Sequence, residues 1–232
     1  MKQLAVKNFI KQNIKVIMLF AAIAIGLTSC RETGDIAPVV NPAYINVVNA
    51  DTAAINFYQN GTRLNNISSI ATGSQSGYLN ATAGAGIYQV KKAGAANYVI
   101  NNYPLTLDSG LFYSIFIAGE TPDKVYFTQD FPPAASSTGA VIRYFNGSPV
   151  SGGIDVNIGS LTYSSPFGST TAFTYISYGA NQVTIYQHNT NTLIYSGTVT
   201  LLVGGVYTLL TTGVPGGTGS NGFAVSLVLF NQ

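Results

Sequence analysis

The sequence predicts an all-β protein in which two tandem antiparallel β-sandwich domains follow a short N-terminal leader. Charged residues make up 8% of the 232 residues and hydrophobic residues 47%, whereas an ordinary soluble domain has about 25% charged residues. Short runs alternate apolar and polar side chains between glycine turns, and no stretch beyond the leader has a helical period. A segment of the chain also occurs twice. These three observations indicate a folded chain of many short strands.

The repeated segment is fifteen residues long and occurs without a gap as Leu105–Gly119 and Val199–Gly213. Its shared residues are Thr106, Leu107, Gly110, Tyr113 and Gly119, which recur as Thr200, Leu201, Gly204, Tyr207 and Gly213. Each copy predicts a strand, a glycine turn and a buried strand that ends in glycine. The repeat indicates a duplicated domain.

The leader, residues 1–29, has the order of a secretory signal. Its first part carries the basic residues Lys2, Lys7, Lys11 and Lys15. The apolar run that follows, Val16–Leu27, has the length of a signal-peptide core and is too short to span a bilayer. An uncleaved anchor, or an ordinary signal peptide followed by an incidental cysteine, is the alternative interpretation.

The leader ends at Leu27-Thr28-Ser29-Cys30, which resembles the lipobox of bacterial lipoproteins. The resemblance implies cleavage before Cys30 and acylation of its thiol and new amino group, with palmitate among the acyl chains. Cys30 is the only cysteine, so it has no disulfide partner in the chain. Several acyl chains hold a protein on a membrane far better than one. Arg31 replaces the aspartate that commonly marks inner-membrane retention, so we expect the outer membrane, with the periplasmic or surface face left open.

Domain boundaries follow from glycine and proline. Residues 30–42 contain Gly34, Pro38 and Pro42 and predict a flexible tether. The first sandwich is expected over 43–130 and the second over 140–232, with a proline-containing linker at 131–139. A single large barrel is the alternative, and the Pro132-Pro133 pair at the repeat boundary argues against it.

Within these domains the alternating runs predict the strands. Asn60-Gly61 predicts a hairpin turn, because both residues tolerate positive φ. In the first domain the strands are expected at Tyr44–Asn49, Ala54–Gln59, Gly77–Asn80, Ile87–Lys92, Tyr98–Ile100, Leu111–Ala118 and Lys124–Thr128. In the second they are expected at Val141–Asn146, Gly153–Asn157, Gln182–Gln187 and Phe223–Phe230.

The charge distribution excludes nucleic acid as a partner. The whole chain has 10 Lys and Arg against 8 Asp and Glu, but removal of the four leader lysines leaves 6 basic residues. A nucleic-acid groove needs clustered Lys and Arg to neutralise phosphates. The only basic pair is Lys91-Lys92, which we interpret as a solvated strand end.

No catalytic or metal site is predicted. His188 is the only histidine; it is expected in an exposed polar turn, and a Ser-His-Asp triad lacks a Gly-x-Ser-x-Gly elbow. Zinc has too few ligands. Glu120, Asp123 and Asp130 supply oxygens of the kind that calcium binds, but they lack EF-hand spacing. We therefore expect no cofactor, no metal and no enzymatic activity.

Tyrosines are the remaining candidates for contact with a ligand. Aromatic faces stack on sugars or pack against proteins, and the hydroxyl adds a hydrogen bond. About half of the strand tyrosines should instead face the core. The second domain is crowded with them, at Tyr163, Tyr175, Tyr178, Tyr186 and Tyr195.

The turn glycines and strand residues resemble the domain-of-unknown-function family 4397 of bacterial envelope proteins. In the first copy the resemblance is carried by Val48–Asp51, Ile55–Gly61, Gly73, Gly77-Tyr78, Gly84, Leu107, Gly110 and Tyr113. In the second it is carried by Val156, Gly168, Gly204 and Tyr207. Asn56 departs from the family, which usually has Asp there, whereas Asp155 keeps it. The resemblance implies an immunoglobulin-like or related sandwich and brings no established activity.

Three functions remain open. The favoured one is a non-enzymatic, lipid-anchored envelope protein that binds a glycan or an envelope protein, or acts in adhesion. The second is a structural subunit whose strands, such as Phe223–Phe230, pair edge to edge across chains. The third and least favoured is a hydrolase that uses Asp51 or Asp155.

Overall fold

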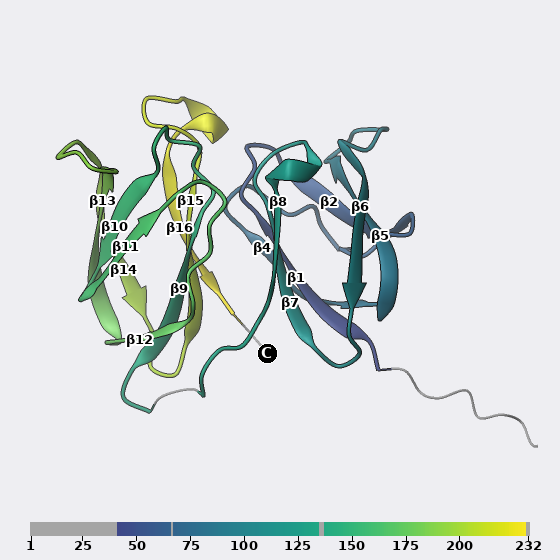
Figure 1. Cartoon of the computed structure of the whole chain (residues 1–232), viewed down its shortest axis with the longest axis horizontal. Helices are drawn as coiled ribbons and strands as arrows, with labels where there is room; N and C mark the ends of the chain where they lie inside the picture. Colours follow the sequence, from purple (N-terminus) through teal and green to yellow (C-terminus); the bar gives the residue numbers. More distant parts are fainter. Residues whose placement is uncertain (1–40, 66, 135–136, 231–232) are drawn as a thin grey trace, which may run out of the picture. The chain divides into compact units, whose positions relative to one another are not determined.

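The computed structural model of the chain describes residues 41–65, 67–134 and 137–230 (Figure 1). The described residues belong to a single compact unit. The predicted signal peptide, residues 1–29, the acylated Cys30 and most of the tether lie outside the described residues.

The first half of the described chain is a pair of four-stranded sheets that face each other (Figure 1). The first inner sheet has the order β4-β1-β7-β8 and the first outer sheet has the order β3-β2-β5-β6. The strands are β1 (Ala43–Asn49), β2 (Ile55–Gln59), β3 (Thr62–Arg63), β4 (Gln75–Ala81), β5 (Gly84–Lys92), β6 (Ile100–Leu107), β7 (Phe112–Ile117) and β8 (Val125–Gln129), with a 3-10 turn η1 (Pro122–Lys124) before β8.

The second half repeats this topology strand for strand. The second inner sheet has the order β12-β9-β15-β16 and the second outer sheet has the order β11-β10-β13-β14. The strands are β9 (Ala140–Asn146), β10 (Ile154–Ile158), β11 (Leu161–Ser165), β12 (Thr174–Ile176), β13 (Gly179–Gln187), β14 (Leu193–Leu201), β15 (Val206–Thr212) and β16 (Ala224–Leu229), with η2 (Gly219–Asn221) before β16. The all-β prediction is confirmed.

The sheets are antiparallel except at one place in each half. β1 pairs parallel with β7, from Tyr44↔Phe112 to Asn49↔Ile117. β9 pairs parallel with β15 in the same way. The predicted antiparallel sandwiches are confirmed for the other strand pairs, and these two parallel pairs are the exceptions. They were not predicted because a strand alternates its side chains with the same period in either direction, so alternation carries no information about pairing direction.

Each half has its own hydrophobic core between its inner and outer sheets. Ile45, Phe57, Tyr88 and Ile115 are fully buried in the first core, and burial raises the pKa of Tyr88 to about 12. The second core contains Ile142, Tyr144, Val156, Ile185 and Leu209 among other fully buried side chains. Phe223, Val225 and Leu227, which alternate along the last predicted strand, pack against it, whereas Leu229 is 39% exposed.

The repeated segment forms the same tyrosine-braced turn in both halves. Gly110 and Gly204 have φ values of 78° and 72°, the left-handed region that glycine adopts at little cost. The Tyr113 hydroxyl accepts a hydrogen bond from the Asp108 N–H at 3.1 Å. The Tyr207 hydroxyl accepts one from the Leu202 N–H at 2.9 Å. Tyrosine recurs because its hydroxyl caps a turn amide at the end of a buried ring.

Replacing either turn tyrosine with phenylalanine should therefore destabilise the protein by similar amounts. Tyr113→Phe and Tyr207→Phe each remove an acceptor for a turn N–H, which costs about 0.5–1.5 kcal/mol. The two turns share no partners, so the double variant should lose the sum of the two costs. Urea unfolding of the three variants measures this; a turn amide satisfied by water instead would leave the free energy of unfolding unchanged.

A third hydrophobic cluster joins the two inner sheets. It consists of Val48, Ala50 and Phe116 from the first half, with Phe145, Leu210 and Val228 from the second. The rings of Phe116 and Phe145 stack with centroids 4.0 Å apart. Both faces of the inner sheets are therefore covered along this contact, which explains why every residue of β9 is buried.

Candidate functional site

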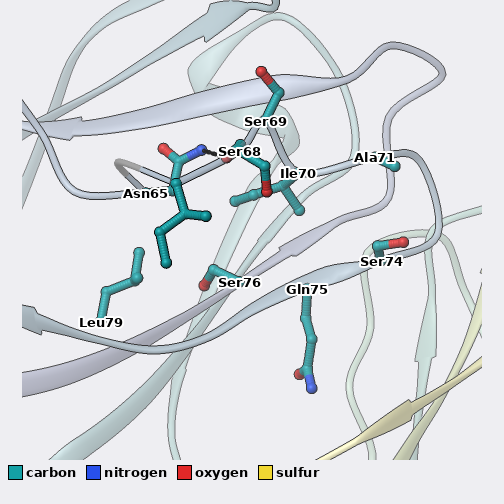
Figure 2. A pocket seen from close by; sticks show the side chains of 10 residues that line it. Asn65, Ser68, Ser69, Ile70, Ala71, Ser74, Gln75, Ser76 and Leu79 are labelled. Carbon is teal, nitrogen blue, oxygen red and sulfur yellow. Dashed lines mark hydrogen bonds between the residues drawn. The ribbon is translucent and has the colours of Figure 1, made fainter.

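A groove of about 370 Å³ lies beside β4, the edge strand of the first inner sheet. We call it the β4 groove. Its polar lining residues are Asn65, Ser68, Ser69, Ser74, Gln75 and Ser76, and its apolar ones are Ile67, Ile70, Ala71 and Leu79. Figure 2 shows Gln75, Ser76 and Leu79 on the strand side, across from Asn65, Ser68 and Ile70 of the preceding loop. The lining contains no charged side chain and no aromatic ring.

Buried asparagines hold the loop side of the β4 groove in place. Asn65 Oδ1 accepts a hydrogen bond from the Phe57 N–H at 2.7 Å, and its Nδ2 donates to the Ser68 carbonyl at 2.8 Å. Asn49 Nδ2 donates to the Ile70 carbonyl at 2.8 Å. The loop is thus tied to β2 and to the end of β1. A groove fixed in this way is formed before a ligand arrives, which reduces the entropy cost of binding.

The strand side of the β4 groove contains an irregularity. The register of β4 against β1 shifts between Asn46 and Val48, and Gly77 has a φ of 69°. Within the shift the Ser76 hydroxyl accepts a hydrogen bond from the Val47 N–H at 2.9 Å. A bulge of this kind turns side chains out of the regular ladder and blunts the strand edge.

A second groove, of about 390 Å³, lies in the second half between β14 and the glycine-rich loop before β16. Its walls include the side chains of Leu193, Tyr195 and Phe223, so it contains aromatic rings that the β4 groove lacks. The rings of Tyr195 and Phe223 are 6.4 Å apart. Of the five tyrosines predicted for a ligand surface, Tyr195 is the one that lines this groove, whereas Tyr175 and Tyr178 are exposed elsewhere at 53% and 57%.

Asp155 and His188 form a pair that the sequence did not reveal. His188 Nδ1 lies 2.7 Å from Asp155 Oδ1, and the Ser164 hydroxyl donates to the same oxygen at 2.5 Å. A catalytic triad places histidine between serine and the carboxylate. Here the carboxylate lies in the middle, so Ser164 has no general base at its hydroxyl. His188 was expected to be exposed, and the exposed fraction of its side chain is 33%.

The interaction between Asp155 and His188 should make the free energy of unfolding depend on pH. The hydrogen bond from Ser164, and then the one from His188, lowers the pKa of Asp155 below its ordinary value of 3.8. A lowered pKa in the folded state stabilises the protein above the unfolded pKa, and this stability is lost as the pH falls through the folded pKa. Asp155→Asn should therefore cost up to about 1 kcal/mol at pH 7 and less near pH 2. Urea unfolding at both pH values checks this; an equal cost at both would contradict it.

The carboxylates considered for calcium are engaged separately. Glu120 Oε1 pairs with Lys92 Nζ at 2.5 Å, and Asp123 Oδ2 with Lys124 Nζ at 3.6 Å. Asp130 is buried against Arg143 at 2.6 Å. Within the described part of the chain, no three His, Cys, Asp or Glu side chains gather closely enough to hold a metal ion. Asp51 is nearly buried, which raises its pKa.

Arg143 is the charged residue that sequence reasoning missed. Its side chain is 2% exposed and lies between the inner sheets. Its Nη1 donates to Asp130 Oδ1 at 2.6 Å, its Nη2 to Ser114 Oγ at 2.7 Å and its Nε to Thr208 Oγ1 at 2.9 Å. Burial lowers the pKa of the Arg143 guanidinium and the Asp130 carboxylate opposes that change. A polar residue within an otherwise apolar strand was the available signal. This cluster joins the halves, and each of the three guanidinium nitrogens of Arg143 already donates within it.

The fold and its grooves define a class: an all-β protein of paired sandwiches with shallow, uncharged surface grooves. The sequence model of the family described as domain of unknown function (DUF4397) matches residues 43–157, from the start of β1 into β10. Over these residues the chain belongs to that family, as the resemblance predicted. Comparison with curated proteins gave no match. No helix in the described ranges is long and apolar enough to cross a bilayer.

Proposed function

We propose that the chain is a lipid-anchored protein of the bacterial outer membrane that binds an uncharged polar ligand in the β4 groove without chemical conversion. The observation that carries the proposal is the groove itself, a preformed recess with six hydroxyl or amide side chains and no charge in its lining. Such a lining favours neutral hydrogen-bonding groups, as a glycan or the backbone of an extended peptide presents.

The membrane attachment rests on Cys30 and the lipobox pattern around it. Acylation there would leave eleven peptide units between the anchored residue and Asn41, where the described chain begins. A fully extended chain of this length reaches at most about 40 Å. The sandwiches would therefore stay near the membrane surface, within reach of envelope glycans and proteins.

The binding role is tested with the purified acylated protein on an array of bacterial envelope glycans and uncharged peptides. Ser68→Trp places a large ring in the β4 groove at an exposed position and should weaken any specific binding at least tenfold. Ser160→Trp, at an exposed turn of the second half, is the matched control and should leave binding unchanged. Absence of any specific binding would overturn the proposal, and binding that Ser68→Trp leaves intact would overturn the assignment to this groove.

The second candidate function is a structural subunit that assembles through strand edges, and β14 is the strand that favours it. Its nine residues include no proline and no charged residue, whereas the equivalent edge strand β6 contains Pro104. The edge of β16 named from the sequence is a poorer candidate, because the Gln75 side chain already donates to the Leu229 carbonyl. Uncharged edges without proline are open to strand addition.

Sedimentation velocity at rising protein concentration tests this second candidate. Thr200→Lys puts a charge on the exposed face of β14, so it should abolish any association that uses this edge. A wild-type protein that stays monomeric at millimolar concentration would exclude the strand-edge role.

A further inference from the structure

The two tyrosine-braced turns have the same backbone conformation but differ in the residues that they expose. In the gapless repeat, Asp108 and Ser109 of the first turn correspond to Leu202 and Val203 of the second. Both turns have a glycine at positive φ and a tyrosine hydroxyl that accepts a turn N–H. The first turn shows that polar residues can form a turn of this backbone conformation. The aliphatic pair in the second turn is therefore unexplained by folding.

The aliphatic pair is exposed to solvent. Leu202 is 64% exposed and Val203 is 53% exposed. Tyr178, which is 57% exposed, immediately precedes Gly179, and Gly179 pairs with Leu201 at the end of the β13–β14 ladder. Tyr178 and the aliphatic pair thus lie at the same end of this ladder. In the first half the residue before the equivalent Gly84 is Ala83. We call Tyr178, Leu202 and Val203 the apolar tip.

The apolar tip belongs to an uncharged part of the sequence. No Lys, Arg, Asp or Glu occurs from Val156 to the end of the chain. A cluster of exposed apolar side chains that includes a tyrosine, with no neighbouring charge in its own turn, is the composition found at membrane interfaces, where an aromatic ring sits at headgroup level.

The apolar tip lies at the end of the molecule where the chain enters from the tether. Arg143 of β9 meets Ser114 of β7, and two residues later in both strands Phe145 stacks on Phe116, so β7 and β9 run in the same direction. Because β1 is parallel to β7 and β9 to β15, all four strands start at one end. Both turns immediately precede such starts.

Direct contacts also place the described N-terminus at this end. The Gly110 N–H donates to the Pro42 carbonyl at 2.9 Å, and the Ser109 hydroxyl donates to the Asn41 carbonyl at 2.6 Å. The first turn therefore touches the residues that connect to the tether. Since the second turn lies at the same end, an anchor at Cys30 would keep that end within the roughly 40 Å reach of the tether from the lipid.

We propose that the apolar tip inserts into the headgroup region of the membrane to which the chain is anchored. This inference rests on the proposed lipid anchor. The partner is a lipid surface, since the tip is a small convex turn and its position at the tether end brings it there. Insertion of three side chains removes apolar surface from water and orients the sandwiches, which a single flexible tether does not do. The β4 groove would then have a fixed position above the bilayer.

Single tryptophan reporters test this, because the chain contains no tryptophan. Full-length acylated protein carrying Leu202→Trp is reconstituted in phosphatidylcholine vesicles with or without brominated acyl chains. The matched control is Leu193→Trp, which is 53% exposed in the wild type and lies at the opposite end of the same strand. Flotation of the vesicles reports the anchor separately, with Cys30→Ser as its control.

The expected result is flotation of both reporters, with a blue-shifted emission and at least twofold quenching by brominated chains for Leu202→Trp only. Val203→Trp gives an independent reading if Leu202→Trp folds poorly. Flotation without quenching of either tip reporter would overturn the inference and leave the anchor intact. Failure of the wild-type protein to float, or flotation unaffected by Cys30→Ser, would overturn the anchor proposal and the inference with it.

Discussion

Replacing Arg143 with alanine is expected to lower the free energy of unfolding by about 3–5 kcal/mol. The substitution leaves the Asp130 carboxylate buried without its cation and removes the hydrogen bonds to Ser114 and Thr208. It also removes the contacts of the guanidinium with the rings of Phe116, Phe173 and Phe230, which lie 4.5–5.3 Å from it. Urea unfolding followed by circular dichroism measures the loss.

A second variant separates the charge from the packing. Removing both partners together, as in Arg143→Met with Asp130→Leu, leaves no unpaired buried charge. The free energy of unfolding of this double variant should therefore be much closer to that of the wild type than the value for Arg143→Ala. The free energy of unfolding of Asp130→Asn alone should lie between those of the double variant and of Arg143→Ala. A double variant as unstable as Arg143→Ala would show that packing, rather than the unpaired carboxylate, dominates the cost.

Gly213→Ala should destabilise the protein by about 2–5 kcal/mol, the combined cost of left-handed strain and overpacking. Gly213 has a φ of 65°, and a Cβ there would lie 2.1 Å from the carbonyl oxygen of Gly222. That oxygen belongs to the backbone of the loop before β16, so relief of the clash requires the loop to move. Thermal unfolding of the variant measures the effect.

The repeat supplies the control for this prediction. Gly119 is the equivalent glycine of the first half, and a Cβ there would meet the Lys124 side chain, at 2.9 Å from its Cγ and 3.0 Å from its Cβ, but no backbone atom as close as the Gly222 oxygen. Gly119→Ala should therefore cost less than Gly213→Ala. Equal losses for the two alanine variants would contradict the assignment of the cost to the Gly222 carbonyl.

The sequence was sufficient for the fold class because its signals are local. Alternation in segments such as Gly153–Asn157 and turn signals such as Asn60-Gly61 each lie within a few residues, and the structure has a strand at the first and a turn at the second. The strands β3 and β12 were not predicted, since two or three residues give too little alternation to detect. The five-residue strand β11 was also missed.

The sites were harder to predict because their members are distant in the chain. His188 and Asp155 are 33 residues apart and Arg143 and Ser114 are 29 apart. Pairing of β10 with β13 brings the first two together, and packing of one inner sheet on the other brings the second two together. Arg143 was counted as one of the few charges of the chain, with no indication that both faces of β9 are covered. The β4 groove depends on a loop whose serines have no periodic pattern. Cys30 and its acylation stay a prediction.

The contact between the inner sheets pairs unlike surfaces at equivalent positions. By strand register, Arg143, Phe173, Thr208 and Phe230 of the second half correspond to Asn46, Tyr78, Ser114 and Asp130 of the first. Two first halves brought face to face would bury two carboxylates with no cation, and two second halves would bury two guanidinium groups. Homotypic dimerisation through this face is therefore penalised, so each half favours the complementary half over a second copy of itself.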